Sequence, residues 1–400
     1  MKIIKHETMH CNAGWRDFSF LRIHTDEGIS GISEYNECYG SPGLSHIIDR
    51  LMINLLSENP LHNEKIHQFL YATTRQAPGG IAQQAIAAIE NAILDIKGKS
   101  LNVPVHTLLG GAIRDKLKLY WSHCGTYRIS EKFSKIMNKP PIKDLSDLVE
   151  MGKTVKSEGY KALKTNIFTF NGTPRLEMQG FGKTEGWPEL NVSSKIIDSL
   201  LKQIDALRDG TGNEIGIHLD LNFNFKIEGY LQITRALDDL NLAWFEIDLY
   251  HPKGLRQIRD ATKTPIASCE SLFGLREFRP FFEEGSMDVA IIDIPWNGIW
   301  LGMKIAAMAE AYEVNVAPHN FYGNLSTLMS AHFCAAVPNF RIMEIDPDDV
   351  PWKDDILTWK PEIINGELTV PNKPGWGAEL NEETLKAHPP KFVNKTINIS

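Results

Sequence analysis

Six polar side chains in the second half of the chain stand at the ends of short apolar runs. They are Asp220, Glu246, Glu270, Asp293, His319 and Glu344. Successive members are 26, 24, 23, 26 and 25 residues apart, which fits one strand, one helix and two short loops. When such units close into a barrel, the strand ends gather at one mouth, where catalytic groups lie. The spacing therefore predicts a barrel whose mouth contains carboxylates and an imidazole.

Three of the carboxylates could bind a metal ion. Asp220, Glu246 and Glu270 end the predicted neighbouring strands 3, 4 and 5. Clustered carboxylates repel one another, so at least one must take a proton unless a cation lies among them. Oxygen-only ligands with room left for substrate and water favour Mg²⁺ over zinc or calcium. We therefore predict one Mg²⁺ per site, although each residue alone could be a helix cap or an ordinary ion-pair partner.

The imidazole has a predicted partner on the next strand. Asp293 ends the sixth strand beside His319 on the seventh, and a carboxylate that accepts one ring proton fixes the histidine tautomer. This pair is predicted to act as a general base. On the second strand, alternation places Lys164 and Asn166 on one face. If that face points inward, an amine and an amide enter the mouth beside the carboxylates.

The predicted site requires a barrel that brings these strand-end side chains together. Residues 117–124 and 162–167 are predicted to be its first two strands, and the six apolar runs above its strands 3 to 8. Because the rhythm stops after the eighth strand, residues 117–345 are predicted to form an α/β barrel of the TIM type with (β/α)7β order. Residues 168–191, rich in Gly, Pro and Asn, are predicted to form a long functional excursion.

The flanking parts of the chain do not follow this rhythm. Residues 18–23 and 31–34 predict an antiparallel hairpin, and residues 81–99 predict an amphipathic helix. Residues 1–116 are therefore expected to form an α+β capping domain. Residues 346–400 are predicted to be an ordered tail that packs back on this domain and completes it. A flexible tail is the alternative, but it would expose the tryptophans and leucines of this segment to solvent.

Composition narrows the classes of partner. The chain has 400 residues, 42% of them hydrophobic, and a net charge of −8, which argues against a nucleic-acid or anionic-membrane partner. The sequence contains no run of about 18 apolar residues, so no transmembrane helix is predicted. Five scattered cysteines without zinc-type spacing, and an amino terminus without an apolar signal core, predict a reduced, cytoplasmic protein. The expected partner is a small molecule.

With these residues the chain resembles the mandelate racemase subgroup of the enolase superfamily over essentially its whole length. The run AAIENAILDIKGKSLNVPVHTLLGG at residues 87–111 is similar to that family's characteristic stretch. Further positions match its metal ligands, its His–Asp dyad, its acid after the last strand and its contact to the substrate carboxylate. These are Asp220-x-Asn222, Glu246, Glu270, Asp293, His319, Glu344 and Ser122-His123. The resemblance implies proton abstraction α to a carboxylate, an enediolate held by Mg²⁺, and a homo-oligomer.

One departure from the family pattern bears on the reaction. The subgroup commonly has Lys-x-Lys on the second strand, whereas this chain has Lys164-Thr165-Asn166. An amide cannot serve as the second base, and elimination of water can proceed with His319 alone. The chain therefore resembles sugar-acid dehydratases of the galactonate or gluconate type, which give a 2-keto-3-deoxy acid. Lys164 would steady the substrate carboxylate or enediolate, and Asn166 and Asn222 would bind hydroxyl groups.

Alternatives to this interpretation remain open. A racemase or epimerase could use Lys164 as its second base, and a barrel of this kind could bind a ligand and a metal without turnover. Glu344 could be a protonated donor to the enediolate or an ordinary carboxylate that binds a hydroxyl, and we favour the donor. Residues 11–15 and 37–43 of the capping domain, with Trp296 near the dyad, are candidates to contact substrate, and plain loop packing is the equal alternative.

Overall fold

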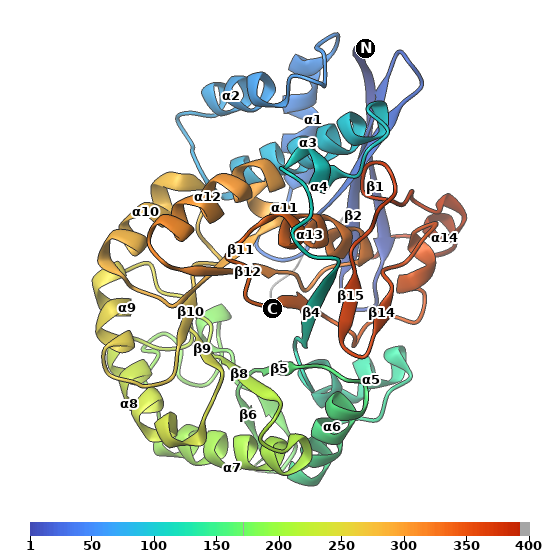
Figure 1. The fold of residues 1–400 in the computed structure, drawn as a ribbon. Helices are drawn as coiled ribbons and strands as arrows, with labels where there is room; N and C mark the ends of the chain where they lie inside the picture. The colour runs from blue at the N-terminus through green and yellow to red at the C-terminus, as the bar shows by residue number, and fades with distance from the viewer. Residues whose placement is uncertain (171, 393–400) are drawn as a thin grey trace.

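The structure is a computed structural model that describes residues 1–170 and 172–392. In this part of the chain eight strands form the barrel: β4 (Lys116–Trp121), β5 (Ala162–Thr165), β8 (Gly216–Asp220), β9 (Trp244–Glu246), β10 (Ile266–Ser268), β11 (Val289–Asp293), β12 (Asn315–His319) and β13 (Met343–Ile345). Neighbouring strands pair in parallel, and β13 pairs with β4 (Figure 1). Val316 of β12 bonds through its backbone to Asn339 and Arg341, just before β13, so the sheet closes. The predicted α/β barrel is confirmed.

Helices surround the barrel, as expected for βα units. They are α5 (Glu131–Met137), α6 (Leu145–Ser157), α7 (Ser194–Thr211), α8 (Ile227–Leu237), α9 (Pro252–Arg259), α10 (Gly274–Glu284), α11 (Ile294–Asn297), α12 (Ile299–Ala311) and α13 (Asn324–Ala336). Asp144 caps the start of α6 in a reciprocal arrangement with Asp147. The predicted excursion after β5 contains a small hairpin of β6 (Phe168–Thr169) and β7 (Arg175–Leu176).

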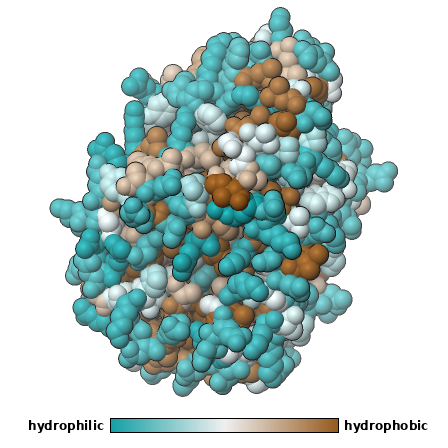
Figure 2. Space-filling view, in the orientation of Figure 1, coloured by the Kyte–Doolittle hydropathy of each residue, from teal (hydrophilic) through white to brown (hydrophobic). Residues whose placement is uncertain are grey.

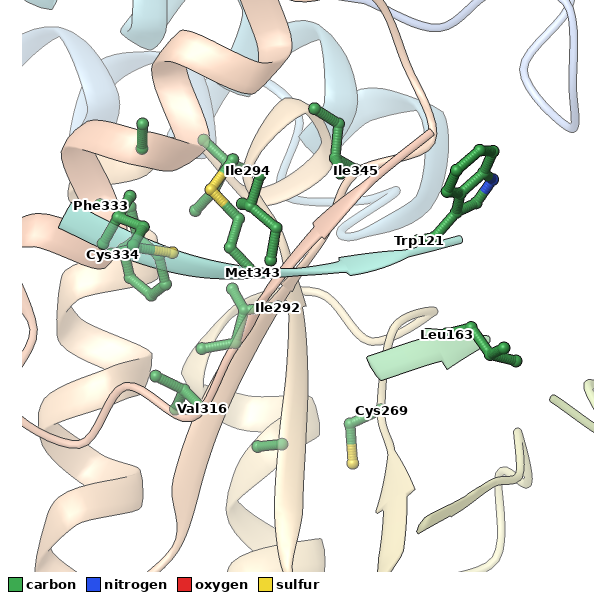
Figure 3. Close-up of a cluster of buried hydrophobic side chains, with 14 of the residues drawn as sticks. Trp121, Leu163, Cys269, Ile292, Ile294, Val316, Phe333, Cys334, Met343 and Ile345 are labelled. Carbon is green, nitrogen blue, oxygen red and sulfur yellow. The ribbon is translucent and has the colours of Figure 1, made fainter. Parts of the chain in front are cut away.

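Alternate side chains of the barrel strands face the helices and the interior. Figure 3 shows outward-facing Ile292, Val316 and Met343 in one buried cluster with Phe333 and Cys334 of α13. The inner face holds a separate cluster of large aromatic and small residues, which are Tyr120, Ala162, Trp244, Ala267, Val289, Ile291 and Ala317. The interior is therefore a packed floor, and the mouth above it is left for chemistry.

The predicted strand ends agree with the structure at most positions. Four of the six polar residues occupy the last position of a strand, namely Asp220, Glu246, Asp293 and His319. Glu270 lies two residues beyond β10, after Cys269 with a φ of 88°. Glu344 lies inside β13, which continues for one more residue. The prediction that each residue ends its strand was wrong at these two positions, because the left-handed turn ends β10 early and β13 runs longer.

An α+β domain packs against α11, α12 and α13. It contains β1 (Ile3–Asn12), β2 (Asp17–Thr25), β3 (Ser30–Tyr35), α1 (Leu44–Met52), α2 (Asn63–Thr73), α3 (Gly80–Ser100) and α4 (Val105–Leu108). The antiparallel pair β2–β3 confirms the predicted hairpin, and α3 confirms the predicted helix. Strand β1, which pairs with the other edge of β2, was missed because most of its side chains are polar or partly exposed.

Two carboxylates of this domain bond to the first turns of barrel helices. Glu90 of α3 accepts the backbone N–H of Trp300 at 3.0 Å, at the start of α12. Glu34 of β3 accepts the N–H groups of Gly323 and Ser326 at 2.7 and 2.9 Å, at the start of α13. A helix N-terminus attracts negative charge, so these bonds hold the loops that follow β11 and β12. Burial raises the pKa of Glu34 to about 7, although the two N–H bonds oppose the rise.

The segment after β13 contacts both domains. Its β15 (Glu367–Thr369) pairs with β14 (Ile363–Ile364) and, antiparallel, with β4 of the barrel, and it ends with α14 (Glu382–Ala387). Trp376 is buried, and its indole N–H donates to the carbonyl of Ile32 at 2.8 Å. Figure 1 shows this red segment beside the blue strands of the first domain. Residues 393–400 of the predicted tail lie outside the described residues, and the boundaries at 116 and 345 stay predictions.

The surface is consistent with burial of the apolar side chains in these cores. On the face in Figure 2 hydrophilic residues predominate, and apolar residues form separated groups. In the described residues, no helix has the length and apolar character needed to cross a membrane.

The first prediction concerns Asp95 of α3, which joins the capping domain to the tail. Its fully buried carboxylate contacts Lys99 at 2.7 Å and accepts the N–H groups of Ile32 and Trp376, each at 2.9 Å. Breaking a buried ion pair typically costs about 3–5 kcal/mol. We expect Asp95→Ala to lower the free energy of unfolding by about that amount in urea at pH 8. The exposed Asp198→Ala should change it by less than about 0.5 kcal/mol, and equal effects would contradict the assignment.

Candidate active site

The predicted base pair lies at the ends of two adjacent strands. Asp293 and His319 are opposite one another in the β11–β12 ladder, and His319 Nδ1 lies 2.6 Å from Asp293 Oδ2. The same oxygen accepts the hydroxyl of Tyr322 at 2.5 Å. His319 Nε2 points toward Glu270, 3.4 Å from Oε2. Burial lowers the pKa of His319, but the charges of Glu270 and Asp293 outweigh it and raise the pKa to about 10. The ring is therefore protonated here at neutral pH.

Lys164 lies among the carboxylates, on the inward face that strand alternation predicted. Its Nζ is 2.8 Å from Glu246 Oε1, 2.8 Å from Glu344 Oε1 and 3.8 Å from Asp220 Oδ2. Burial alone would lower the pKa of this lysine, yet Glu246 and Glu344 raise it well above its ordinary value. The ammonium group is thus a fixed positive charge at the mouth.

Glu344 accepts three donors and is held as a carboxylate. Ser122 donates its hydroxyl to Oε1 at 2.5 Å, Asn320 donates its backbone N–H to Oε2 at 2.6 Å, and Lys164 contacts Oε1. Burial raises the pKa of Glu344, but Lys164 and the other donors bring it well below its usual range. These contacts favour the ionised alternative for Glu344 over the protonated donor, and its role in the reaction stays a prediction.

The carboxyl groups at the ends of β8 and β9 are buried close to other acidic groups, which disfavours their ionised forms. Burial raises the pKa of Asp220. Burial also raises the pKa of Glu246 to about 8, with Lys164 opposing the rise and Asp220 adding to it. Asp248 is buried too, and its Oδ2 has no hydrogen-bond partner among the described residues. Burial and the nearby charges of Glu270 and Asp220 raise the pKa of Asp248 well above its ordinary value.

The three predicted metal ligands reach the same mouth without forming a ligand set. Asp220 and Glu246 are partners in the β8–β9 ladder, and Glu270 follows the next strand. Within the described residues, no three His, Cys, Asp or Glu side chains are grouped closely enough to hold a metal ion. Lys164 instead supplies the positive charge beside Glu246.

The two asparagines predicted to bind hydroxyl groups bond to neighbouring side chains. Asn166 donates to Asn222 Oδ1 at 3.4 Å, and its own oxygen accepts the hydroxyl of Thr126 at 2.7 Å. Asn222 adopts a φ of 43°, a left-handed conformation that asparagine tolerates better than most residues. Asn166 is therefore fixed in place at the end of β5.

Aromatic rings line the mouth beside the dyad. The ring centroids of Trp296 and Phe321 lie 5.4 and 5.1 Å from that of His319. Trp296 Nε1 is buried without a hydrogen-bond partner among the described residues, so it has a donor available for a ligand. Phe321 also contacts His123, with centroids 5.8 Å apart.

Both predicted capping-domain loops reach this aromatic wall. Trp15 packs on Tyr127 with centroids 4.5 Å apart, and Tyr39 lies 6.2 Å from Phe321. The guanidinium of Arg16 lies 5.7 Å from the Phe321 ring. The loops therefore stand where they could contact the distal part of a ligand.

Two sequence profiles cover most of the chain. The enolase C-terminal domain-like family matches residues 147–384, and the mandelate racemase / muconate lactonizing enzyme N-terminal domain matches residues 6–110. The chain belongs to the enolase superfamily. It is an enzyme of that superfamily, and the resemblance carried by the sequence motifs is confirmed.

Relatives within the superfamily have different names. A D-galactonate dehydratase from Xanthomonas euvesicatoria is 28% identical over 98% of this chain and 97% of its own. A D-xylonate dehydratase from Haloferax volcanii is 26% identical over 92% of this chain and 84% of its own. A crystal structure from Burkholderia xenovorans is 48% identical, with a TM-score of 0.95, covering 98% of this chain and 96% of that one. That protein is named as a candidate L-alanine-DL-glutamate epimerase and is bound to magnesium and fumarate.

Several residues at the mouth of the barrel were not predicted from the sequence. Asp248 follows Glu246 by two positions, the spacing that keeps two strand residues on one face, and this signal could have found it. Tyr322 and Phe321 lie directly beyond His319 and could have been considered with it. The roles of Asp346 and Glu34 had no sequence signal, because their partners His123 and α13 are distant in the chain.

The second prediction concerns Asp248. Because its folded pKa is raised, the native state holds a proton that the unfolded chain releases, so stability falls as pH rises above the ordinary range of aspartate. We expect Asp248→Asn, which removes this ionisation, to stabilise the metal-free protein by about 1 kcal/mol at pH 8. The gain should shrink at pH 4 in urea titrations. Asp239→Asn, 92% exposed at its side chain, is the control. Destabilisation by Asp248→Asn at pH 8 would contradict the assignment.

Proposed function

We propose that the protein is a Mg²⁺-dependent dehydratase that removes the proton α to the carboxylate of a sugar acid and eliminates the 3-hydroxyl. The product would be a 2-keto-3-deoxy acid. One observation carries the proposal: the position available for a second base on β5 is Asn166, an amide bonded to Thr126 and Asn222. The His319–Asp293 pair is intact beside it.

Each of the residues at the site would have a separate role in such a reaction. Neutral His319 would take the α-proton at Nε2, and Asp293 would stabilise the resulting imidazolium through Nδ1. The charge of Lys164 would steady the substrate carboxylate and the enediolate, since fixed donors in a buried site stabilise developing negative charge. Tyr322 would keep Asp293 oriented. Trp296 would close the site beside the ring of His319.

The chemistry of these donors suits Mg²⁺, although the three carboxylates would have to move closer together to hold it. Asp220, Glu246 and Glu270 offer hard oxygen ligands. Burial and the charge of Asp220 raise the pKa of Glu246 although Lys164 opposes the rise, so a cation beside these carboxylates would be favourable. The unpartnered Oδ2 of Asp248 lies close enough to feel the same charges. Mg²⁺ held by Asp220, Glu246 and Glu270 would supply electrostatic stabilisation of the enediolate. With its charge balanced in this way, Glu270 would favour the protonated form of His319 less strongly.

The names of the relatives support two candidate reactions. The D-galactonate and D-xylonate dehydratases align with almost the whole chain, which favours elimination from a sugar acid. The Burkholderia neighbour favours epimerisation, with Lys164 as the second base. The two ion pairs of Lys164 oppose this second candidate, because they hold its amine protonated.

A panel of sugar acids and dipeptides incubated with the enzyme and Mg²⁺ in D₂O separates these candidates. Dehydration would give a keto acid from at least one sugar acid. Deuterium exchange with inverted configuration and no loss of water would instead establish the epimerase. Ligand-induced stabilisation without turnover of any compound would establish a binding protein.

The third prediction concerns His319. We expect His319→Asn to lower turnover of the sugar acid by about 10²–10⁴-fold, because the α-proton loses its acceptor. Mg²⁺ binding, followed by calorimetry, should persist because the three carboxylates remain. The surface variant His62→Asn serves as a control and should keep full activity. Activity of His319→Asn within about tenfold of the wild type would mean that another group is the base.

The fourth prediction concerns the protons displaced by metal. Below its folded pKa of about 8, Glu246 holds a proton that Mg²⁺ must displace. We expect Mg²⁺ binding to release about one proton more per ion at pH 7 than at pH 9, because Glu246 is already ionised at pH 9. Calorimetry in buffers of different ionisation enthalpy measures this release. Equal release at both pH values would contradict the assignment to Glu246.

A further inference from the structure

A second histidine–aspartate pair lies at the same mouth, and the proton transfers described above do not use it. His123 follows β4 and Asp346 follows β13, which are neighbouring strands of the barrel. His123 Nδ1 is 3.3 Å from Asp346 Oδ2 and 3.3 Å from Ser122 Oγ. The side chain of Asp346 is completely buried, and it makes no hydrogen bond of ordinary geometry to a described residue. A buried carboxylate of this kind needs positive charge nearby. The ring of His123 lies within 3.3 Å, and the charge of Arg16 and the hydroxyl of Tyr127 also act on Asp346.

The ring of His123 is held with its other nitrogen turned away from this partner. Tyr127 stacks on the ring at a centroid distance of 5.1 Å, and Phe321 meets it edge-on at 5.8 Å. The side chain keeps 19% of its surface exposed. In the described part of the chain, no group forms a hydrogen bond with Nε2. A protonated His123 would also act on Asp220, whose pKa burial raises and the charges of Lys164 and His123 lower.

The backbone at His123 is strained. Its φ of 45° lies in the left-handed region, which costs free energy for residues other than glycine. Hydrogen bonds on both sides hold this conformation, from Ser122 N–H to the carbonyl of Ile345 and from Cys124 N–H to the carbonyl of Lys164, each 2.8 Å long. Strain that the surroundings enforce is concentrated at functional sites, where it orients a side chain.

His123 lies where the distal part of a substrate bound at His319 would reach. Phe321 touches both histidines, so His123 and His319 flank one ring. Tyr127 joins His123 to Trp15 of the capping-domain loop. A substrate whose α-carbon lies at His319 would extend its remaining carbons toward these loops. The first atom on that path is C3, which carries the leaving hydroxyl.

We propose that His123, oriented by Asp346, is the acid that protonates the departing 3-hydroxyl. This inference rests on the proposed dehydration and replaces the expectation that His319 performs both proton transfers. His319 then keeps the α-proton while the second pair completes the elimination. The site would have two acid–base groups although Asn166 cannot be one of them.

The proposed step balances in protons and electrons. His319 takes the α-proton, and the electrons of the broken C–H bond form the C2–C3 double bond as the C3–O bond breaks. The proton of His123 Nε2 joins the leaving oxygen, which departs as water. The resulting enol becomes the 2-keto acid when C3 takes the proton held by His319. The C2 hydroxyl releases its own proton, which restores the charge of His123 directly or through water.

The test separates elimination from α-proton exchange. His123→Asn removes the acid while keeping a residue that tolerates the left-handed backbone. In D₂O with the best sugar acid of the panel, we expect keto-acid formation to fall by about 10²-fold or more. Exchange of the α-proton, followed by NMR, should stay within about threefold, because His319 is unchanged. A 3-deoxy-3-fluoro analogue, whose fluoride leaves without prior protonation, should restore elimination to within about tenfold of the wild type.

A matched set of variants makes the result decisive. Asp346→Asn, which disturbs only the orienting group, should show the same split with a smaller loss, and the exposed His62→Asn should leave both rates unchanged. Keto-acid formation by His123→Asn within threefold of the wild type would overturn the inference. So would equal loss of exchange and elimination that the fluoro analogue does not restore. If the wild-type enzyme dehydrates no sugar acid, the proposed function fails and this role fails with it.

Discussion

The burial of many carboxylates at one end of the barrel is the constraint on which the site depends. Asp220, Glu246, Glu270, Asp293 and Glu344 are each at most 8% exposed. Removing such groups from water costs several kcal/mol per ion unless positive charge and donors compensate. Lys164 and His319 provide part of that compensation, so the positions of the acid–base groups follow from the need to balance charge. Burial raises the pKa of Glu246 to about 8, so the charge of Lys164 does not fully offset the burial of this carboxyl.

The capping domain depends on the same principle at a different place. Glu34 and Glu90 are buried carboxyl groups that accept backbone N–H groups at the N-termini of α13 and α12. These bonds fix the loops that follow β12 and β11, and those loops carry Phe321 and Trp296 to the mouth. The domain therefore does more than cover the site: it sets where the aromatic wall stands relative to His319. Changes in the capping domain should alter substrate fit even where they touch no substrate.

The periodic part of the fold could be predicted because each βα unit repeats one physical pattern. The strand-end carboxylates followed from that repeat, as did the inward face of Lys164. What the sequence could not provide was the pairing across the mouth. The donors that ionise Glu344 come from β4, β5 and the loop after β12, and their chain separations obey no period. The turn at Cys269 and the polar strand β1 were missed because neither shows an apolar alternation.

The different names of the relatives reflect a chemical ambiguity within the superfamily. Dehydration and epimerisation share α-proton abstraction, which the His319–Asp293 pair can perform in either reaction. They differ in the atom that receives the second proton: the 3-oxygen in one, the opposite face of the α-carbon in the other. Lys164 is committed to Glu246 and Glu344. Tyr127 packs on both His123 and Trp15 of a capping-domain loop, so under the proposed dehydration a second proton would come from this side and go to the leaving oxygen.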